Sequence, residues 1–196
     1  LGLLEGKVAL VTVAGGGLGR AHALLLAEHG ACVVVNDLGG ARDGTGSSNS
    51  MADSVVEEIR NAGGQATATY GSVTDDDAAK AMVQCAVDNF GRLDILINNA
   101  GILRDRSFKN MTDAEWDAVI DVHLRGSYLA TKHAWQQMLA QGEGGRIIMT
   151  SSTSGLIGNF GQANYGAAKA GVAGFMRVLA LELSLIHISE PTRPSQ

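Results

Sequence analysis

The chain has little proline and little cysteine, with two residues of each among 196. Both prolines, Pro191 and Pro194, fall at the C-terminal end, so proline interrupts no element before them. Cys32 and Cys85 sit inside apolar patterns, which favours buried, reduced thiols over a disulfide. Because a disulfide framework is absent, a small secreted scaffold is excluded and the cytoplasm is the expected location.

The chain also lacks a basic excess and a long apolar run. It carries 15 lysines and arginines against 20 aspartates and glutamates, for a formal net charge of −5. Proteins that bind nucleic acids or anionic membranes usually show the opposite balance, so neither partner is expected. No apolar run approaches the roughly 20 residues that a membrane-spanning helix needs. His22, His29 and His133 have no metal-ligand spacing, so no metal site is predicted.

Glycine is abundant, with 26 residues. Glycines separate short apolar segments from the longer amphipathic segments that alternate with them. The apolar segments predict strands at residues 7–13, 31–37, 65–70, 93–98 and 146–151. The segments between them predict helices at residues 20–29, 51–62, 74–90, 112–141 and 163–183, with Thr74 as the N-cap of the third helix. This alternation is typical of right-handed βαβ units. It predicts an α/β fold with a doubly wound parallel sheet of the Rossmann type.

A glycine-rich turn joins the first predicted strand to the first helix, and it contains Gly15, Gly17 and Gly19. Backbone N–H groups at such a turn gather at a helix N-terminus, where a pyrophosphate binds. Asp37 ends the second strand about 20 residues further on, where a carboxylate can accept hydrogen bonds from both ribose hydroxyls of an adenosine. Its charge repels a 2′-phosphate, which favours NAD over NADP, although Arg42 softens that preference. The alternative is that Asp37 only terminates a strand.

Tyr165 and Lys169 lie four residues apart on the last predicted helix and therefore share a face. A free tyrosine, with a pKa of about 10, is not a base at neutral pH, but a neighbouring ammonium favours the phenolate. Such a pair can exchange a proton with an alcohol or a carbonyl. The alternative is an exposed tyrosine beside a solvated lysine.

Polar side chains follow two of the predicted strands at their carboxyl ends, where open α/β sheets bind ligands. Ser152 follows the fifth strand, thirteen residues before Tyr165, and its hydroxyl can hydrogen-bond a substrate oxygen. The other hydroxyls of residues 150–154 are equally suited on chemistry alone. Asn98 and Asn99 end the fourth strand, and we interpret them either as braces for the backbone or as ribose contacts.

These features together, in this order, resemble the short-chain dehydrogenase/reductase family over residues 5–182. Four segments narrow the resemblance: VNDLGG at 35–40, NNAGILRDRSFKNMTD at 98–113, VHLRG at 122–126 and GNFGQANYGAAKAG at 158–171. They are similar to the (3R)-hydroxyacyl-CoA dehydrogenase domain of peroxisomal-type multifunctional enzymes and to stand-alone bacterial relatives of that domain. The glycine- and serine-rich loop at residues 38–50, which is long for a strand-to-helix connection, fits the same subgroup.

The resemblance implies an oxidoreductase that transfers a hydride between NAD and a 3-hydroxyacyl-CoA or similar secondary alcohol. The alternatives are a 3-oxoacyl reductase or another short-chain alcohol dehydrogenase and, from another functional class, a non-catalytic nucleotide-binding fragment. The implied partners are the acyl-CoA or alcohol substrate and a second copy of the chain, paired through the last two long helices. A eukaryotic source makes a peroxisomal location the alternative to the cytoplasm.

The resemblance also assigns roles to individual residues. Tyr165 would be the catalytic acid and base, Lys169 would favour its phenolate and hold the nicotinamide ribose, and Ser152 would orient the substrate oxygen. Contacts with NAD would come from Gly15, Gly17, Leu18, Gly19, Asp37, Ser72, Val73, Asn99, Gly101, Tyr165 and Lys169. Asn98 and Gly101 would shape the floor of the pocket.

The chain departs from the family pattern at three points. Val13 replaces the glycine that opens the family's glycine turn, and a β-branched residue is poorly suited to a positive φ. A weakened NAD site is therefore expected if that position needs a positive φ. His123 stands where the wider family has a proton-relay asparagine. The VHLRG subgroup of the family also has a histidine at this position. The family also continues with two strands, a substrate-covering segment and a Pro-Gly loop, which predicts a sheet incomplete at its C-terminal edge.

The last residues suggest an origin outside the gene. Residues 183–193 read LSLIHISEPTR, which resembles the translation of a transposon-end adapter used in DNA library preparation. A match of that length rarely arises by chance, so we expect native sequence to end near Glu182. Residues 1–182 are then a truncated NAD-binding domain, and residues 183–196 are a non-native tail. The alternative is a genuine amphipathic tail.

Overall fold

The computed structural model describes residues 2–186, which contain one parallel sheet. Its strands are β1 (Val8–Thr12), β2 (Cys32–Asn36), β3 (Gln65–Thr69), β4 (Ile95–Asn98) and β5 (Arg146–Met149). They lie in the order β3-β2-β1-β4-β5, and every pairing is parallel. This order confirms the predicted doubly wound α/β fold. The chain moves outward from β1 to β3 and then returns to the other side of β1, so the switch point, where such sheets bind ligands, lies between β1 and β4.

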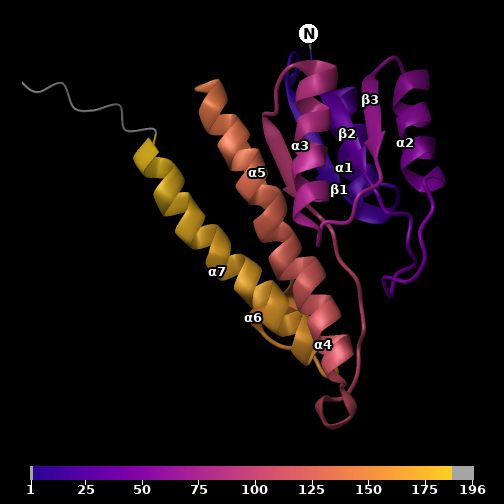
Figure 1. The fold of residues 1–196 in the computed structure, drawn as a ribbon, viewed down its shortest axis with the longest axis vertical. Coiled ribbons are helices and arrows are strands. Elements are labelled where there is room, and N and C mark those ends of the chain that lie inside the picture. Colours follow the sequence, from indigo (N-terminus) through magenta and orange to yellow (C-terminus); the bar gives the residue numbers. More distant parts are fainter. Residues whose placement is uncertain (1, 187–196) are drawn as a thin grey trace, which may run out of the picture.

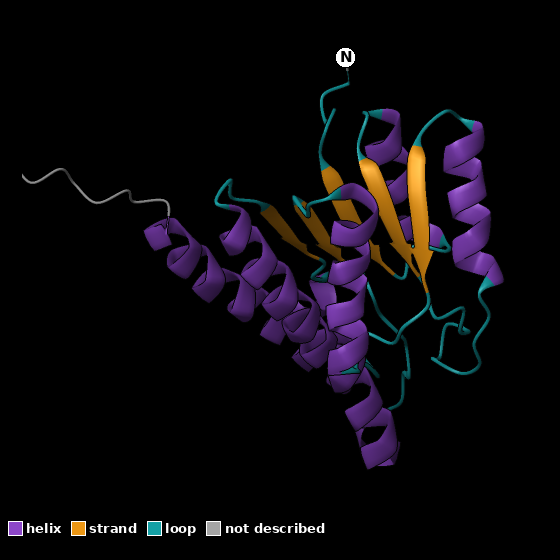
Figure 2. Cartoon of the chain, turned by 45° about the horizontal axis from the view of Figure 1, so that its top comes forward, coloured by secondary structure: helices purple, strands orange, loops and turns teal. Residues whose placement is uncertain are grey.

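Helices cover both faces of the sheet (Figure 2). The helices α1 (Gly17–Glu28) and α2 (Ser50–Asn61) pack on one face, and α3 (Asp76–Phe90) and α5 (Gly126–Gln141) pack on the other. The last helix, α7 (Ala163–Ile186), packs on α4 (Asp113–Ile120), as Figure 1 shows near the foot of the molecule. Both α4 and α7 therefore lie next to the edge of the sheet that carries the carboxyl ends of the strands.

Alternation along the strands builds the two cores. In β1, Ala9 and Val11 join the core under α1 and α2, whereas Val8 and Leu10 join the core under α3 and α5. All five residues of β1 are buried. A strand that is apolar on both faces needs helices on both sides, which is why the continuous apolar runs of the sequence predicted this architecture.

The long helix expected at residues 112–141 is not uniform. Thr112 and Glu115 form a capping box at the start of α4, and a π-helical turn at Asp121–Arg125 joins α4 to α5. A π turn adds one residue to a helical turn, and such turns gather at functional sites. The hydrophobic pattern continues on both sides of the turn, so the sequence predicted the whole helix but not the turn.

One further local prediction needs correction. The N-cap of α3 is Asp75 rather than Thr74, because the Asp75 carboxylate accepts a hydrogen bond from the Ala78 N–H at 2.8 Å. The Thr74 hydroxyl is instead paired with that of Ser72 at 2.9 Å. A short helix, α6 (Thr153–Leu156), lies between β5 and α7, where no element was predicted, because a single turn is too short to show periodicity.

The two cysteines are free thiols, as predicted, but Cys32 and Cys85 are half-buried rather than fully buried. Burial raises the pKa of both thiols, which keeps them protonated at neutral pH. Among residues 2–186, no helix combines the length and the apolar character that crossing a bilayer requires. The predicted boundary after Glu182 falls inside α7, and residues 187–196 of the expected tail lie outside the described residues, so the tail stays a prediction.

Candidate active site

The glycine turn after β1 is held from below by Asp37, which follows β2. One oxygen of the Asp37 carboxylate accepts a hydrogen bond from the Gly15 N–H at 2.7 Å, and the other accepts from the Gly39 N–H at 2.6 Å. Asp37 is buried, with an exposed fraction of only 3%. Each carboxylate oxygen has two lone pairs, so both oxygens keep room for another donor, such as a ribose hydroxyl. Asp37 therefore does more than end a strand.

Asn99 braces the same turn from the other side. Its Nδ2 donates to the carbonyl oxygens of Thr12 and Val13, at 3.0 Å each, and its own N–H donates to Thr12 Oγ1 at 3.0 Å. Gly19 packs against this brace so closely that a Cβ there would lie 2.2 Å from the Val13 oxygen. Of the two interpretations of this asparagine, backbone bracing is thus confirmed, and its contact with NAD stays a prediction.

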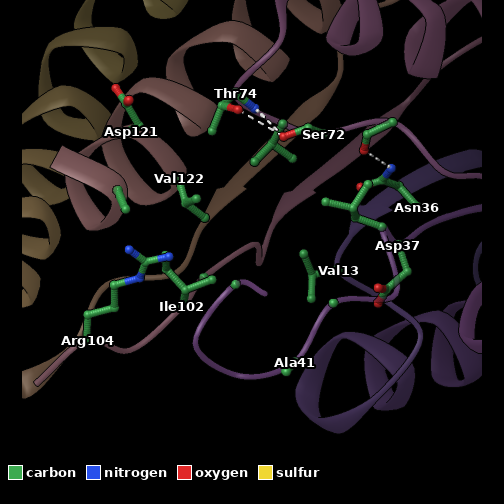
Figure 3. A pocket seen from close by; sticks show the side chains of 17 residues that line it. Val13, Asn36, Asp37, Ala41, Ser72, Thr74, Ile102, Arg104, Asp121 and Val122 are labelled. Atoms are coloured by element: carbon green, nitrogen blue, oxygen red, sulfur yellow. Dashed lines mark hydrogen bonds between the residues drawn. The ribbon is translucent and has the colours of Figure 1, made fainter. Parts of the chain in front are cut away.

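A cavity of about 290 Å³ opens at the carboxyl ends of β1 to β4. Four of the predicted cofactor contacts line it: Asp37, Ser72, Val73 and Gly101. The lining residues that the sequence did not single out as contacts are Val13, Asn36, Leu38, Gly40, Ala41, Gly44, Gly71, Thr74, Ile102, Arg104, Ala118, Asp121 and Val122. Figure 3 shows Asn36 and Asp37 on one side of the cavity and Ile102 and Arg104 on the other. Gly15, Gly17, Leu18, Gly19 and Asn99 belong to the adjoining turn and its brace and are not among the lining residues.

The long loop at residues 38–50 crosses to the far wall of this cavity. The Leu103 N–H donates to the Arg42 carbonyl at 3.1 Å, and the Arg104 side chain donates from Nε to the Asp43 carbonyl at 3.0 Å. A Cβ on Gly44 would lie 3.2 Å from Ile102 Cγ2, so the loop passes close to this side chain. The unusual length of the loop was the only sequence signal for this contact, which no local pattern encodes.

Val13 is the one non-glycine residue with a positive φ among residues 2–186, at +50°. It opens the glycine turn and lines the cavity. Left-handed backbone costs an L-residue about 1–2 kcal/mol, and a β-branched side chain suffers most. The departure from the family pattern is therefore a strained position beside the candidate cofactor site.

We expect Val13→Gly to stabilise the chain and to tighten NAD binding. Relief of the strain outweighs the greater backbone entropy of glycine in the unfolded state, for a net gain of about 1 kcal/mol. Urea unfolding and calorimetric titration with NAD measure the two effects. Val13→Ala removes the β-branch but keeps the Cβ, so it should fall between the two. A Val13→Gly variant less stable than the parent contradicts the assignment of strain.

Lys169 is buried and reaches from α7 to the end of β5. Its Nζ donates to the Thr150 carbonyl at 2.5 Å and lies 5.7 Å from the centroid of the Tyr165 ring. Burial lowers the pKa of Lys169 to about 8, so the ammonium persists at neutral pH. The Ser151 hydroxyl donates to the Lys169 carbonyl at 3.0 Å and adds a second link between β5 and α7. The sequence prediction that Tyr165 and Lys169 share a face is confirmed.

Among the serines of residues 150–154, Ser152 is the one whose hydroxyl proton has no acceptor in the described part of the chain. Ser151 donates its proton to the Lys169 carbonyl, and Ser154 donates its proton to Gln162 Oε1 at 2.7 Å. Ser152 caps α6 by accepting from the Ser154 N–H at 3.2 Å, and its own proton meets no acceptor within residues 2–186. Among the three serines, Ser152 is therefore the one able to donate to a substrate oxygen.

His123 projects from the π-helical turn into the space beside Tyr165. The two rings meet edge to face, with centroids 5.1 Å apart and planes at 89°. His123 Nε2 contacts the Ile102 carbonyl at 2.8 Å, while Nδ1 is buried without a partner in the described part of the chain. A Cβ on Gly101 would lie 2.4 Å from His123 Cε1, so only glycine allows this approach. Burial, assisted by the charge of Lys169, lowers the pKa of His123 to about 4.

We expect this burial to make the fold sensitive to acid. As the pH falls from about 6.5 toward 4, the unfolded chain takes up a proton on His123 that the folded chain resists, so stability falls by up to about 3 kcal/mol. Urea unfolding at a series of pH values measures that slope. His123→Asn should flatten it, whereas His29→Asn, an exposed histidine on α1's C-cap, should not. An unchanged slope in His123→Asn contradicts the prediction.

Several known proteins are similar in sequence to this chain. Residues 7–189 match the sequence model of the short chain dehydrogenase family. The chain is 57% identical over 178 residues to the peroxisomal multifunctional enzyme type 2 of Mus musculus, covering 91% of this chain and 24% of the relative. It is 48% identical over 176 residues to a hydroxyacyl-CoA dehydrogenase of Mycobacterium tuberculosis, covering 86% of this chain and 54% of the relative.

A solved structure shares the fold as well. The crystal structure of a short chain dehydrogenase from Mycobacterium avium superposes with a TM-score of 0.86 at 49% identity, over 94% of this chain and 65% of that chain. The chain spans between 24% and 54% of the length of the two curated relatives. Residues 7–189, which match the family model, contain the whole sheet and the candidate site of this chain.

Proposed function

The chain belongs to the short-chain dehydrogenase family, and from this we propose that it transfers a hydride between NAD and C3 of a 3-hydroxyacyl-CoA or similar secondary alcohol. One observation carries the proposal. Tyr165 lies against the buried Lys169 ammonium, and Lys169 is bonded to the segment that presents Ser152. This group lies at the same edge of the sheet as the cavity that Asp37 lines.

Members of this family use a nicotinamide dinucleotide, and the residues of the cavity fit its adenosine half. Asp37 offers two carboxylate oxygens with free lone pairs for the vicinal ribose hydroxyls. Val73 and Ile102 supply apolar surface for a flat ring. The Asp37 charge opposes a 2′-phosphate, so we propose NAD rather than NADP as the cofactor.

The mechanism assigns one task to each side chain. Ser152 donates a hydrogen bond to the substrate oxygen and fixes the carbinol in place. Tyr165, as phenolate, takes the hydroxyl proton while the C3 hydrogen leaves as a hydride. The Lys169 ammonium favours the phenolate through its charge. Bound NAD supplies the hydride acceptor, and in the reverse direction Tyr165 returns the proton to the new alkoxide.

The relatives support the proposed substrate class. One relative is named for hydroxyacyl-CoA dehydrogenation, and the peroxisomal multifunctional enzyme shares more than half of the aligned residues. A 3-oxoacyl reductase performs the same chemistry in the opposite direction. The two activities differ in cofactor, because reductive synthesis draws on NADPH and Asp37 disfavours it.

The test is NADH formation by the protein produced from the complete gene, with NAD and either (3R)- or (3S)-3-hydroxyacyl-CoA. We expect turnover of the 3R isomer. Activity on simple alcohols alone would replace the substrate class but keep the chemistry. Heat of NAD binding without any turnover would favour a non-catalytic nucleotide-binding protein, and the absence of both would overturn the proposal.

We also propose that two copies pair through α5 and α7. An apolar groove of about 350 Å³ lies between these helices, lined by Tyr128, Thr131, Lys132, Trp135, Gln136, Leu139, Phe175 and Leu179. Tyr128 and Leu139 are exposed there, as expected of a surface that a partner covers. Light scattering should give twice the mass of one chain, and a monomer would contradict the pairing.

We further propose a cytoplasmic location. Fractionation of source cells tests this location against a peroxisomal one.

A further inference from the structure

We propose that Asn164 is a positioning residue, which fixes Tyr165 relative to Lys169 and to the wall of the cofactor cavity. The inference rests on the proposed function, since it concerns the same tyrosine. Asn164 does not line the cofactor cavity, so it acts through its neighbours.

Asn164 is the most deeply buried polar residue near the site, with an exposed fraction of 0%. Its Oδ1 accepts a hydrogen bond from the Tyr165 N–H at 2.7 Å. Its Nδ2 donates to the Arg104 carbonyl at 3.1 Å and to the Glu115 carbonyl at 3.0 Å. One amide group thus joins three segments that are far apart in the sequence.

The bond from Tyr165 to Asn164 pairs a backbone N–H that the helix itself leaves without a partner. The first four N–H groups of a helix have no partner within the helix, and Tyr165 is the third residue of α7. Tyr165 is half-buried, and an N–H shielded from water without a partner would be costly. By accepting it, Asn164 fixes the rotation of the first turn of α7, and with it the direction in which the Tyr165 ring leaves the helix.

The other two partners connect that turn to the rest of the site. Arg104 lines the cavity and holds the long loop at residues 38–50 through its bond to the Asp43 carbonyl. Glu115 belongs to the capping box that starts α4, which leads to the π turn bearing His123. Asn164 is therefore the point where the cavity wall, α4 and the tyrosine-bearing helix are tied together.

Replacement of Asn164 by alanine leaves two carbonyls and one N–H without their partner. The first turn of α7 is then free to shift against α4, while Lys169, one turn later, stays anchored to Thr150. A displacement of about 1 Å at a reacting group can lower the rate by about 100-fold. The Tyr165 ring also loses its fixed place beside the Lys169 ammonium, which lies 5.7 Å from the ring centroid.

The experiment compares Asn164→Ala with the parent protein from the complete gene. We expect kcat to fall by about 30-fold to 100-fold, with KM for the hydroxyacyl-CoA and Kd for NAD within about threefold of the parent values. Asn110→Ala removes an exposed asparagine whose side chain has one local bond to Ser107, and it should leave all three quantities unchanged.

A second readout does not need the substrate. The Tyr165 amide hydrogen is bonded to Asn164 Oδ1, and NMR in deuterated water measures its rate of exchange with solvent. In Asn164→Ala this hydrogen should exchange faster than in the parent, while the amide hydrogens in the middle of α7 should keep their parent rates. If the alanine variant does not fold, Asn164→Ser, which keeps one donor in a smaller side chain, takes its place in both measurements.

The outcomes separate the two proposals. A parent protein that binds NAD but turns over no hydroxyacyl-CoA overturns the proposed substrate, while the exchange of the Tyr165 amide hydrogen still tests Asn164. A fall in kcat that matches the loss of NAD-binding stoichiometry, with unchanged exchange of that hydrogen, shows a purely structural role and overturns the inference. Unchanged kcat in Asn164→Ala overturns it as well.

Discussion

Tyr165→Phe is expected to abolish turnover and to leave NAD binding intact. The proton of the substrate alcohol then has no acceptor, and loss of a general acid or base lowers rates by about 100-fold to 10,000-fold. The phenol oxygen makes no hydrogen bond within residues 2–186, so its removal leaves no buried partner unsatisfied. Kinetics with (3R)-3-hydroxyacyl-CoA and calorimetry with NAD measure the two effects on the same preparation.

A matched control for this variant is Tyr70→Phe. The Tyr70 hydroxyl donates to Asp53 at 2.5 Å, on an exposed surface beyond β3, so this change also removes one phenolic oxygen. Its kcat and NAD affinity should equal those of the parent. Retained turnover in Tyr165→Phe would remove Tyr165 from the mechanism and direct attention to the neighbouring His123 or Lys169.

The sheet and its helices could be predicted because each rests on a periodic pattern. The strand Val8–Thr12 is apolar except for its last residue. Such a run needs helices on both faces of the sheet, wherever it lies in the chain. The same holds for the helix that carries Tyr165 and Lys169, since a spacing of four residues places them on one face. Local patterns of this kind survive folding because tertiary contacts reinforce them.

The contacts that complete the site depend on pairs far apart in the sequence. Asn164 bonds to Arg104 and Glu115, and its fully buried position is visible only after folding. The π turn that presents His123 is likewise invisible in a helical pattern that continues on both sides. The family pattern identified Val13 as a departure, but only the backbone showed a positive φ. Sequence thus predicted the helices and strands better than it predicted the contacts that join them.

Asp37→Asn is the substitution with the largest expected effect on the cofactor. An amide nitrogen cannot accept a hydrogen bond, so either the Gly15 N–H or the Gly39 N–H loses its acceptor and the glycine turn is loosened. The two ribose hydroxyls also lose a charged acceptor, and hydrogen bonds to charged groups are worth about 1.5–3 kcal/mol each. We expect the Kd for NAD to rise by about 10-fold to 100-fold.

The same change should narrow the gap between NAD and NADP, because the charge that repels a 2′-phosphate is gone. Calorimetric titration of parent and variant with both dinucleotides measures this ratio directly. Asp77→Asn makes the same chemical change at an exposed position in the first turn of α3 and should leave both affinities as they are. If Asp37→Asn weakened both dinucleotides by the same factor, Asp37 would serve only to hold the turn. The preference for NAD would then need another origin, and the cavity wall near Arg42 and Arg104 would be the place to look for it.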